Sequence, residues 1–246
     1  MLTFGVDLAS QDRRTAGCLV RWHDRPVVVE VMHPLSDDTI VRWARDPEVG
    51  VTAIDAPFGW PRAFVDAVAQ YGLGRPFPDA GTDLWLRGTD RAVWAAVRRR
   101  PLSVSGDRIA YPAVRAARLL SRLGPGRPAH RNGSDRVIEV YPAAALAAWE
   151  IEPGRYKQRD GLEARCALLS ALVEALPGLD VGEHYPALVA TDHAIDAMIA
   201  ALVARAYLLG QVCRRTEAQA KDAAVEGWIW LPDRPARFLL GAGQYG

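Results

Sequence analysis

The feature that most constrains this chain is the run VGVTAIDA at residues 49–56, which is almost entirely apolar yet carries an aspartate near its end. Such a run is typical of a strand covered on both faces, so it predicts a central strand of a sheet flanked by helices. A carboxylate at the end of a core strand is costly to desolvate unless a partner compensates its charge. Asp55 is therefore expected either to have a structural partner or to belong to a functional site.

The pattern around this run predicts an α/β fold with the chain order strand, strand, strand, helix, strand. Residues 14–24 and 25–33 read as two strands joined by a turn at Asp24-Arg25-Pro26, and Ser36 is a candidate cap for a short helix that Pro47 ends. The other predicted strands are 2–9 and 135–142, with a late short strand or covering segment at 225–232, and the longest predicted helices are 161–176 and 190–210. We expect a single domain over residues 1–246.

Residues 60–135 are less regular and read as an elaborated, arginine-rich helical insertion between the fourth and fifth strands. Short helical patterns occur around 62–71, 90–99 and 112–123. From Arg87 to Arg136 the chain carries twelve arginines against three acidic residues, a local net charge of +9, although the whole protein has a net charge of only +1. Arginine binds phosphate through a two-pronged fork, so this clustering favours a phosphate-bearing partner such as nucleic acid.

Composition places the chain among ordinary globular proteins of the cytoplasm. It has 246 residues, and its three cysteines form no CxxC pair, so neither a zinc knuckle nor a disulfide framework is indicated. The first ten residues lack the basic and long apolar regions of a signal peptide. The most apolar segment, 187–209, is interrupted by charged residues, which argues against a membrane span.

Four aspartates interrupt apolar elements: Asp7 in the first strand, Asp55 at the end of the fourth, and Asp192 and Asp196 on the last long helix. Residues four apart share one side of a helix, and that side continues through Ile199, so both helical acids are aimed at the protein body. Each acid also has a structural interpretation. Asp7 can cap a turn, Asp192 can interact with the helix dipole, and Asp55 can form an Asx-turn.

Together, these acids are better explained by one shared site that holds a divalent cation. Carboxylates about 4–5 Å apart repel one another by several kcal/mol, and the chain has no lysine before Lys157. Mg²⁺ and Mn²⁺ prefer hard oxygen ligands, and two such ions about 3.5–4 Å apart can activate a water and stabilise the leaving oxygen of a phosphodiester. Neither a histidine cluster nor an HExxH motif is present to favour zinc.

The motifs GVDLAS, AIDAP and DHAIDAMIAAL, in this order of elements, resemble the ribonuclease H-like superfamily, and within it the Holliday-junction resolvase branch. GVD, AIDAPFGWP, RGTDR, EVYPAAAL, DHAIDA and EGWIWLP together resemble the family catalogued as domain of unknown function 429, described as predicted ribonuclease H-like nucleases. The resemblance covers residues 5 to 232. It implies a mixed five-stranded sheet flanked by helices, in which the first and fourth strands are neighbours and bring Asp7 beside Asp55.

The resemblance and the charge pattern add weaker candidates. Glu139 on the fifth strand would lie beside Asp55 in that fold, either as a further metal ligand or hydrogen-bond acceptor, or as the partner of an arginine. Arg87, in RGTDR, either offers its guanidinium to a phosphate or forms a structural ion pair with Asp90 at a helix start. Lys157 is a candidate phosphate contact. Arg115 and Arg118 fall on one side of a helix and are candidates to bind substrate.

Two functions remain open at this point. In the first, Asp7, Asp55, Asp192 and Asp196 hold Mg²⁺ or Mn²⁺, and the protein is a metal-dependent nuclease that binds DNA or RNA through its arginines. In the second, the protein is a non-catalytic or nucleotide-phosphate-binding member of the wider superfamily, which includes the actin-like proteins. The absence of a glycine-rich phosphate loop and the presence of only one lobe's length of chain count against the second.

Overall fold

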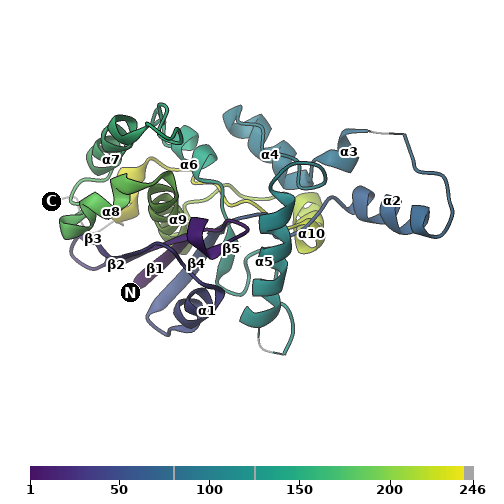
Figure 1. Ribbon diagram of the computed structural model, residues 1–246, viewed down its shortest axis with the longest axis horizontal. Helices are drawn as coiled ribbons and strands as arrows, with labels where there is room; N and C mark the ends of the chain where they lie inside the picture. Colours follow the sequence, from purple (N-terminus) through teal and green to yellow (C-terminus); the bar gives the residue numbers. More distant parts are fainter. Residues whose placement is uncertain (80, 125, 241–246) are drawn as a thin grey trace.

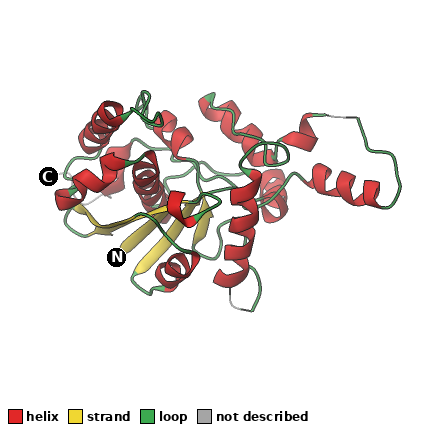
Figure 2. Cartoon of the chain, viewed as in Figure 1, coloured by secondary structure: helices red, strands yellow, loops and turns green. Residues whose placement is uncertain are grey.

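A single mixed sheet of five strands organises the protein in a computed structural model that describes residues 1–79, 81–124 and 126–240 (Figures 1 and 2). The strands lie in the order β3-β2-β1-β4-β5. β1, β2 and β3 form an antiparallel meander, whereas β1–β4 and β4–β5 are parallel pairs. Their bounds are β1 Leu2–Asp7, β2 Ala16–Trp22, β3 Pro26–Met32, β4 Val49–Asp55 and β5 Val137–Glu139. The predicted mixed sheet flanked by helices is confirmed.

Helices cover both faces of this sheet. In Figure 1, α6, α7, α8 and α9 lie on one side of the strands, and α1 lies on the other, next to α5. The α-helices are α1 Asp37–Arg45, α2 Arg62–Gly72, α3 Thr82–Trp85, α4 Gly88–Val97, α5 Ala110–Leu123, α6 Pro142–Ala148, α7 Leu162–Ala175, α8 Tyr185–Ala190, α9 Asp192–Leu208 and α10 Glu217–Glu226. The described residues also form the short 3₁₀ turns η1 Asp12–Arg14, η2 Gly182–His184 and η3 Ala236–Leu240.

The strands alternate between two apolar cores, as the period of two in a strand requires. Phe4 of β1 and Ile54 of β4 belong to the core shared with α1 and α5. Ala53 of β4 belongs to the opposite core, which contains α9. Asp7 and Asp55 have the parity of the residues that face α9, so both carboxylates leave the sheet on that side.

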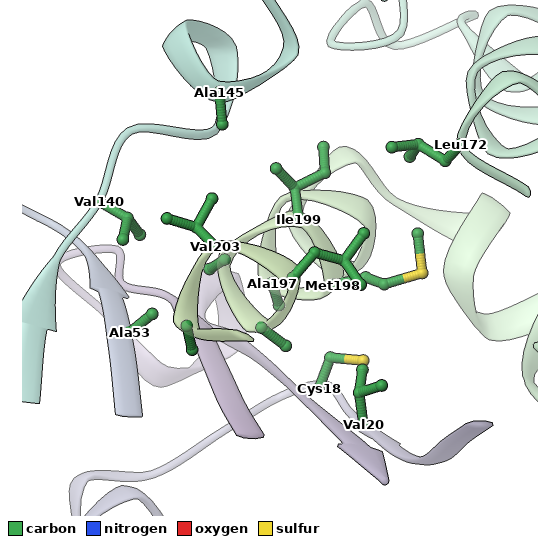
Figure 3. Close-up of a cluster of buried hydrophobic side chains, with 14 of the residues drawn as sticks. Cys18, Val20, Ala53, Val140, Ala145, Leu172, Ala197, Met198, Ile199 and Val203 are labelled. Carbon is green, nitrogen blue, oxygen red and sulfur yellow. The ribbon is translucent and has the colours of Figure 1, made fainter. Parts of the chain in front are cut away.

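α9 is the central helix of the larger core and is buried along most of its length. Thr191 caps its first turn by accepting a hydrogen bond from the backbone N–H of Ala194. Figure 3 shows α9 lying across the strands, with Ile199 and Val203 directed away from the sheet toward the elements that carry Ala145 and Leu172. A helix that is apolar on every side has no solvent face, which is why its one deeply buried acid, Asp196, stands out.

Close contact between α9 and β1 depends on Gly5. A Cβ atom added at Gly5 would lie 2.0 Å from the carbonyl oxygen of Ala197 and 2.3 Å from the amide nitrogen of Ala201. Because both atoms belong to the helix backbone, no side-chain rotation can relieve the overlap. The missing side chain lets the helix approach the strand closely, two residues before Asp7.

The segment between β4 and β5 contains α2, α3, α4 and α5, and Figure 1 shows α2 and α3 extending away from the sheet. β5 is shorter than the predicted strand 135–142, because Pro142 begins α6. The predicted late strand 225–232 is not formed as such: Glu226 ends α10, and two residues that follow make isolated bridges, Ile229 with Glu139 at the edge of the sheet and Pro232 with Val212. In the described part of the chain, no helix combines the length and the hydropathy that a membrane crossing requires.

Candidate functional site

Three of the four predicted aspartates converge at one end of the sheet. Asp7 and Asp55 are direct partners in the parallel pairing of β1 with β4. Asp196 reaches the same point from α9. Among the described residues, one carboxylate oxygen from each of Asp7, Asp55 and Asp196 lies within 4.8 Å of the other two. Three hard oxygen donors from three separate elements can hold a divalent metal ion.

Burial and mutual repulsion disfavour the ionised forms of Asp7 and Asp55 when no cation is bound between them. Burial, together with the negative charge of Asp196, raises the pKa of Asp7 to about 6, although its contact with His193 opposes the rise. Burial and the neighbouring Asp7 hold the pKa of Asp55 well above its ordinary value. Within the described residues, the Asp55 side chain has no hydrogen-bond or ion-pair partner. A cation bound between these carboxylates would remove the conflict.

Two neighbours compensate part of the negative charge. His193 Nδ1 lies 2.6 Å from Asp7 Oδ2, and this hydrogen bond raises the pKa of His193. On the other side, Lys157 Nζ lies 2.6 Å from Asp196 Oδ2, and the Tyr156 hydroxyl donates to Asp196 Oδ1 over 2.7 Å. Burial opposes the charge of Lys157, but the nearby Asp196 carboxylate raises its pKa overall. One lysine and one histidine thus accompany three carboxylates.

Asp192 is not brought into the cluster. It is the first residue of α9, one turn before Asp196, and is half-buried. Its charge contributes to the raised pKa of His193, so it lies on the histidine side of the site. Residues one helical turn apart are separated by about 6 Å. This distance leaves the Asp192 carboxylate outside the cluster formed by Asp7, Asp55 and Asp196.

Glu139 lies in a different charge cluster. In the sheet it is the partner of Ile54, not of Asp55, and it therefore leaves β5 on the opposite face. Its two oxygens accept from Arg87 Nη1 and Nη2 over 2.9 and 2.7 Å, and one of them also accepts the Phe58 backbone N–H. The structure thus places Glu139 as the partner of an arginine, one of the two roles considered for it.

Arg87 is the buried centre of that second cluster and does not offer its guanidinium to a phosphate. Its side chain donates to Glu139, to both oxygens of Asp90 and to the Glu226 carbonyl. The residue is 1% exposed, and all five N–H groups have acceptors. Asp90 instead caps the start of α4, because its carboxylate accepts the backbone N–H of Arg87 as well as the guanidinium. The geometry is that of the structural ion pair at a helix start.

Arg115 is likewise committed to structure rather than to a substrate. It is 8% exposed, and its guanidinium donates to Asp37, Asp12, the Thr15 hydroxyl and the Ala9 carbonyl. These bonds fasten α5 to α1 and to the loop after β1. Arg118, one turn further along α5, is exposed and does not border the candidate site. The prediction that Arg115 and Arg118 lie on a helix is confirmed, but their spacing does not indicate which side of the helix is buried.

A cavity of about 520 Å³ opens over the aspartates. Its lining includes Asp7, Asp55, Lys157 and His193, together with three residues that the sequence analysis did not select: Arg14, Arg108 and Tyr111. The signal that could have found Arg14 is its position in the short connection between β1 and β2, seven residues after Asp7. Arg108 belongs to the arginine-rich segment 87–136, but nothing in the sequence separates it from the other arginines there. Tyr111 carries no such signal, because only the course of the chain at the start of α5 brings it to the site.

The fold and these residues define an α/β protein whose three-aspartate cluster can hold a metal ion. The sequence matches the family described as "Protein of unknown function (DUF429)" over residues 5–220, and the chain belongs to that family. No match was found among curated proteins or among solved structures.

Proposed function

We propose that this protein is a metal-dependent nuclease that hydrolyses phosphodiester bonds in nucleic acid, built on a ribonuclease H-like sheet. The observation that carries the proposal is the meeting of Asp7, Asp55 and Asp196 within 4.8 Å at one end of the sheet. The adjacency of β1 and β4, with Asp7 directly opposite Asp55, supports the ribonuclease H-like assignment.

The donor set fits Mg²⁺ or Mn²⁺ better than softer ions. All three side chains are carboxylates, which suit hard divalent cations. Burial and mutual repulsion already raise the pKa of Asp7 and of Asp55, so a bound cation would relieve an existing electrostatic cost. When bound, such an ion lowers the pKa of a coordinated water and stabilises negative charge on a phosphoryl oxygen.

The surrounding side chains have distinct roles in this proposal. His193 orients the Asp7 carboxylate through its 2.6 Å contact. Tyr156 and Lys157 hold both oxygens of Asp196, and the half-exposed ammonium of Lys157 also borders the cavity, where it can bind a phosphate. Asp192 contributes negative charge one helical turn from the cluster. Arg118 lies on α5 outside the cavity lining, where its exposed positive charge can bind nucleic acid that extends beyond the cavity.

The test is a cleavage assay with purified protein and end-labelled DNA and RNA, single-stranded and duplex, in Mn²⁺, Mg²⁺ or EDTA. We expect cleavage that requires the divalent ion and is abolished by Asp7→Asn and by Asp55→Asn, with both variants retaining the wild-type circular dichroism spectrum. Full activity in either folded variant would overturn the proposal.

The same preparation separates the nuclease from a nucleotide-binding protein. Thermal unfolding is followed with ATP, GTP, Mn²⁺ and short oligonucleotides. A nuclease is expected to be stabilised by Mn²⁺ and by oligonucleotides. Stabilisation by ATP or GTP, without any response to Mn²⁺ and oligonucleotides, would instead identify a nucleotide-phosphate-binding member of the superfamily.

A further inference from the structure

The cavity over the aspartates has cationic side chains that the protein itself does not use. Arg14 of η1 and Arg108 of the loop before α5 both border it, and both are exposed. In the described part of the chain neither guanidinium has a hydrogen-bond or ion-pair partner, in contrast with those of Arg87 and Arg115, which are fully engaged. Unpaired guanidinium groups beside a phosphodiester-cleaving site are suited to binding phosphate oxygens.

An exposed aromatic ring borders the same cavity as these cations. Tyr111, near the start of α5, is 73% exposed although it borders the cavity, and within the described residues its hydroxyl has no hydrogen-bond partner and its ring no aromatic partner. Leu102, Ile109 and Pro112 make the neighbouring wall apolar. An aromatic face next to arginines is the combination that single-strand-binding proteins use, because every base can stack on it while the arginines bind the backbone.

The size of the cavity limits what can enter. A volume of about 520 Å³ lies within the range of sites that hold small molecules, about 300–1,000 Å³. One or two nucleotides fit in such a space. In a duplex each base is stacked and paired inside the helix, so it offers no free face to a side chain unless it is flipped out. An unpaired strand can present both its base and its phosphates.

We propose that this cavity recognises an unpaired nucleotide strand, with Arg14 and Arg108 binding its phosphates and Tyr111 stacking on a base. The proposal names the substrate class of the nuclease proposed above and rests on that function. Its test measures binding rather than cleavage, so the two can fail separately.

The experiment uses the full chain carrying Asp55→Asn, which prevents cleavage during the measurement. Fluorescence anisotropy is recorded with a labelled 12-nucleotide strand, as DNA and as RNA, and with the same strand annealed to its complement. We expect each single strand to bind at least about tenfold more tightly than its duplex. Adding Tyr111→Ala is expected to weaken single-strand binding about tenfold, and Tyr111→Phe is expected to restore it.

The arginines are tested by the salt dependence of the same binding. Each phosphate contact on a single strand contributes about −0.7 to the slope of log K against log salt. Arg14→Gln and Arg108→Gln are each expected to flatten the slope by about that amount. The matched controls are Tyr71→Ala, an exposed tyrosine on α2, and Arg21→Gln, an exposed arginine at the opposite end of the sheet, and neither is expected to change binding.

Three results would overturn the proposal. Equal affinity for single strand and duplex would remove the preference for unpaired bases. An equal loss in Tyr71→Ala and Tyr111→Ala would show that no stacking specific to the cavity exists. Tighter binding of AMP than of any oligonucleotide, unaffected by Tyr111→Ala, would identify a small phosphorylated ligand instead. Cleavage of duplex by the wild-type protein alongside any of these would leave the nuclease proposal intact.

Discussion

Two clusters of buried charge border the same cavity, and they solve the problem of buried carboxylates in opposite ways. In the cluster of Arg87, Asp90 and Glu139, every guanidinium N–H has an acceptor, and Glu139 also receives a backbone N–H. In the aspartate cluster, Asp7 and Asp55 face each other, and within the described residues the Asp55 carboxylate has no hydrogen-bond or ion-pair partner. Buried charges that are fully hydrogen-bonded and paired belong to the structural framework of a protein. Buried carboxylates that repel one another destabilise the folded state, and such groups cluster at functional sites.

The largest expected difference between the clusters is in activity. Under the proposed function, Asp55→Asn removes a carboxylate that binds the cation, and cleavage is expected to fall by at least about 10³-fold, or about 4 kcal/mol in the barrier. Initial rates with a labelled oligonucleotide in Mn²⁺ measure this. The matched control is Asp66→Asn, an exposed aspartate on α2, which should cleave at the wild-type rate. A similar loss of cleavage rate in Asp55→Asn and Asp66→Asn would show that the aspartate cluster has no special role in activity.

The second cluster is expected to dominate stability. Glu139→Gln leaves Arg87 with one charged partner fewer in a buried site, and breaking a buried ion pair costs about 3–5 kcal/mol in free energy of unfolding. Urea denaturation measures the loss. Mn²⁺ affinity, measured by calorimetry under conditions in which the variant is folded, should stay close to that of the wild type. A large loss of Mn²⁺ affinity without a loss of stability would make Glu139 a metal ligand.

Metal addition is expected to stabilise the wild-type protein through the aspartate cluster. At a Mn²⁺ concentration one hundred times its Kd, the gain is about 2.7 kcal/mol, and EDTA should reverse it. Because the pKa of Asp7 is raised to about 6, more of this carboxyl is protonated at pH 5 than at pH 7.5, and the gain should shrink at the lower pH. Thermal unfolding at both pH values measures it. An undiminished gain in Asp55→Asn would place the ion elsewhere.

The smallest expected effect is the stability of the metal-free protein. The folded-state pKa of Asp7, about 6, exceeds its ordinary value of 3.8, so this group favours folding at low pH and loses that contribution as the pH rises through 6. Asp7→Asn removes the penalty and should stabilise the metal-free protein by about 1–3 kcal/mol at pH 7, with little difference below pH 4. Urea denaturation in EDTA measures this. Destabilisation at pH 7 would mean that Asp7 is paired as well as Glu139 is.

Local patterns were sufficient for the individual strands and for the acids that they and the last long helix carry, whereas the pairing of the first strand with the fourth was implied only by the family resemblance. The apolar run at 49–56, ended by Asp55, identified a central strand, and the buried acid of the 190–210 helix identified Asp196. The partner of Glu139 could not be predicted from local patterns. Its position on the fifth strand was correct, but its partner depends on register, and a shift of one residue exchanges the two faces of a strand.

The partners of the arginines could not be predicted from the sequence either. The clustering of positive charge between residues 87 and 136 is plain in the sequence, yet the structure assigns Arg87 and Arg115 to buried ion pairs, whereas the Arg108 guanidinium borders the cavity with no ion-pair partner among the residues that the structure describes. The guanidinium group itself is the same in Arg87, Arg108 and Arg115. What differs is whether carboxylates from distant parts of the chain, such as Glu139 or Asp12, lie within reach.

The sequence by itself determined the order of the five strands along the chain, the burial of α9 and the presence of acids on core elements, because periodicity and the cost of buried charge act over short stretches of chain. Only the tertiary structure decided that Asp7, Asp55 and Asp196 meet without Asp192 and Glu139, and that Arg14, Arg108 and Tyr111 surround them. Those outcomes depend on strand register and on the close approach of α9 at Gly5, which are set by contacts between residues far apart in the chain.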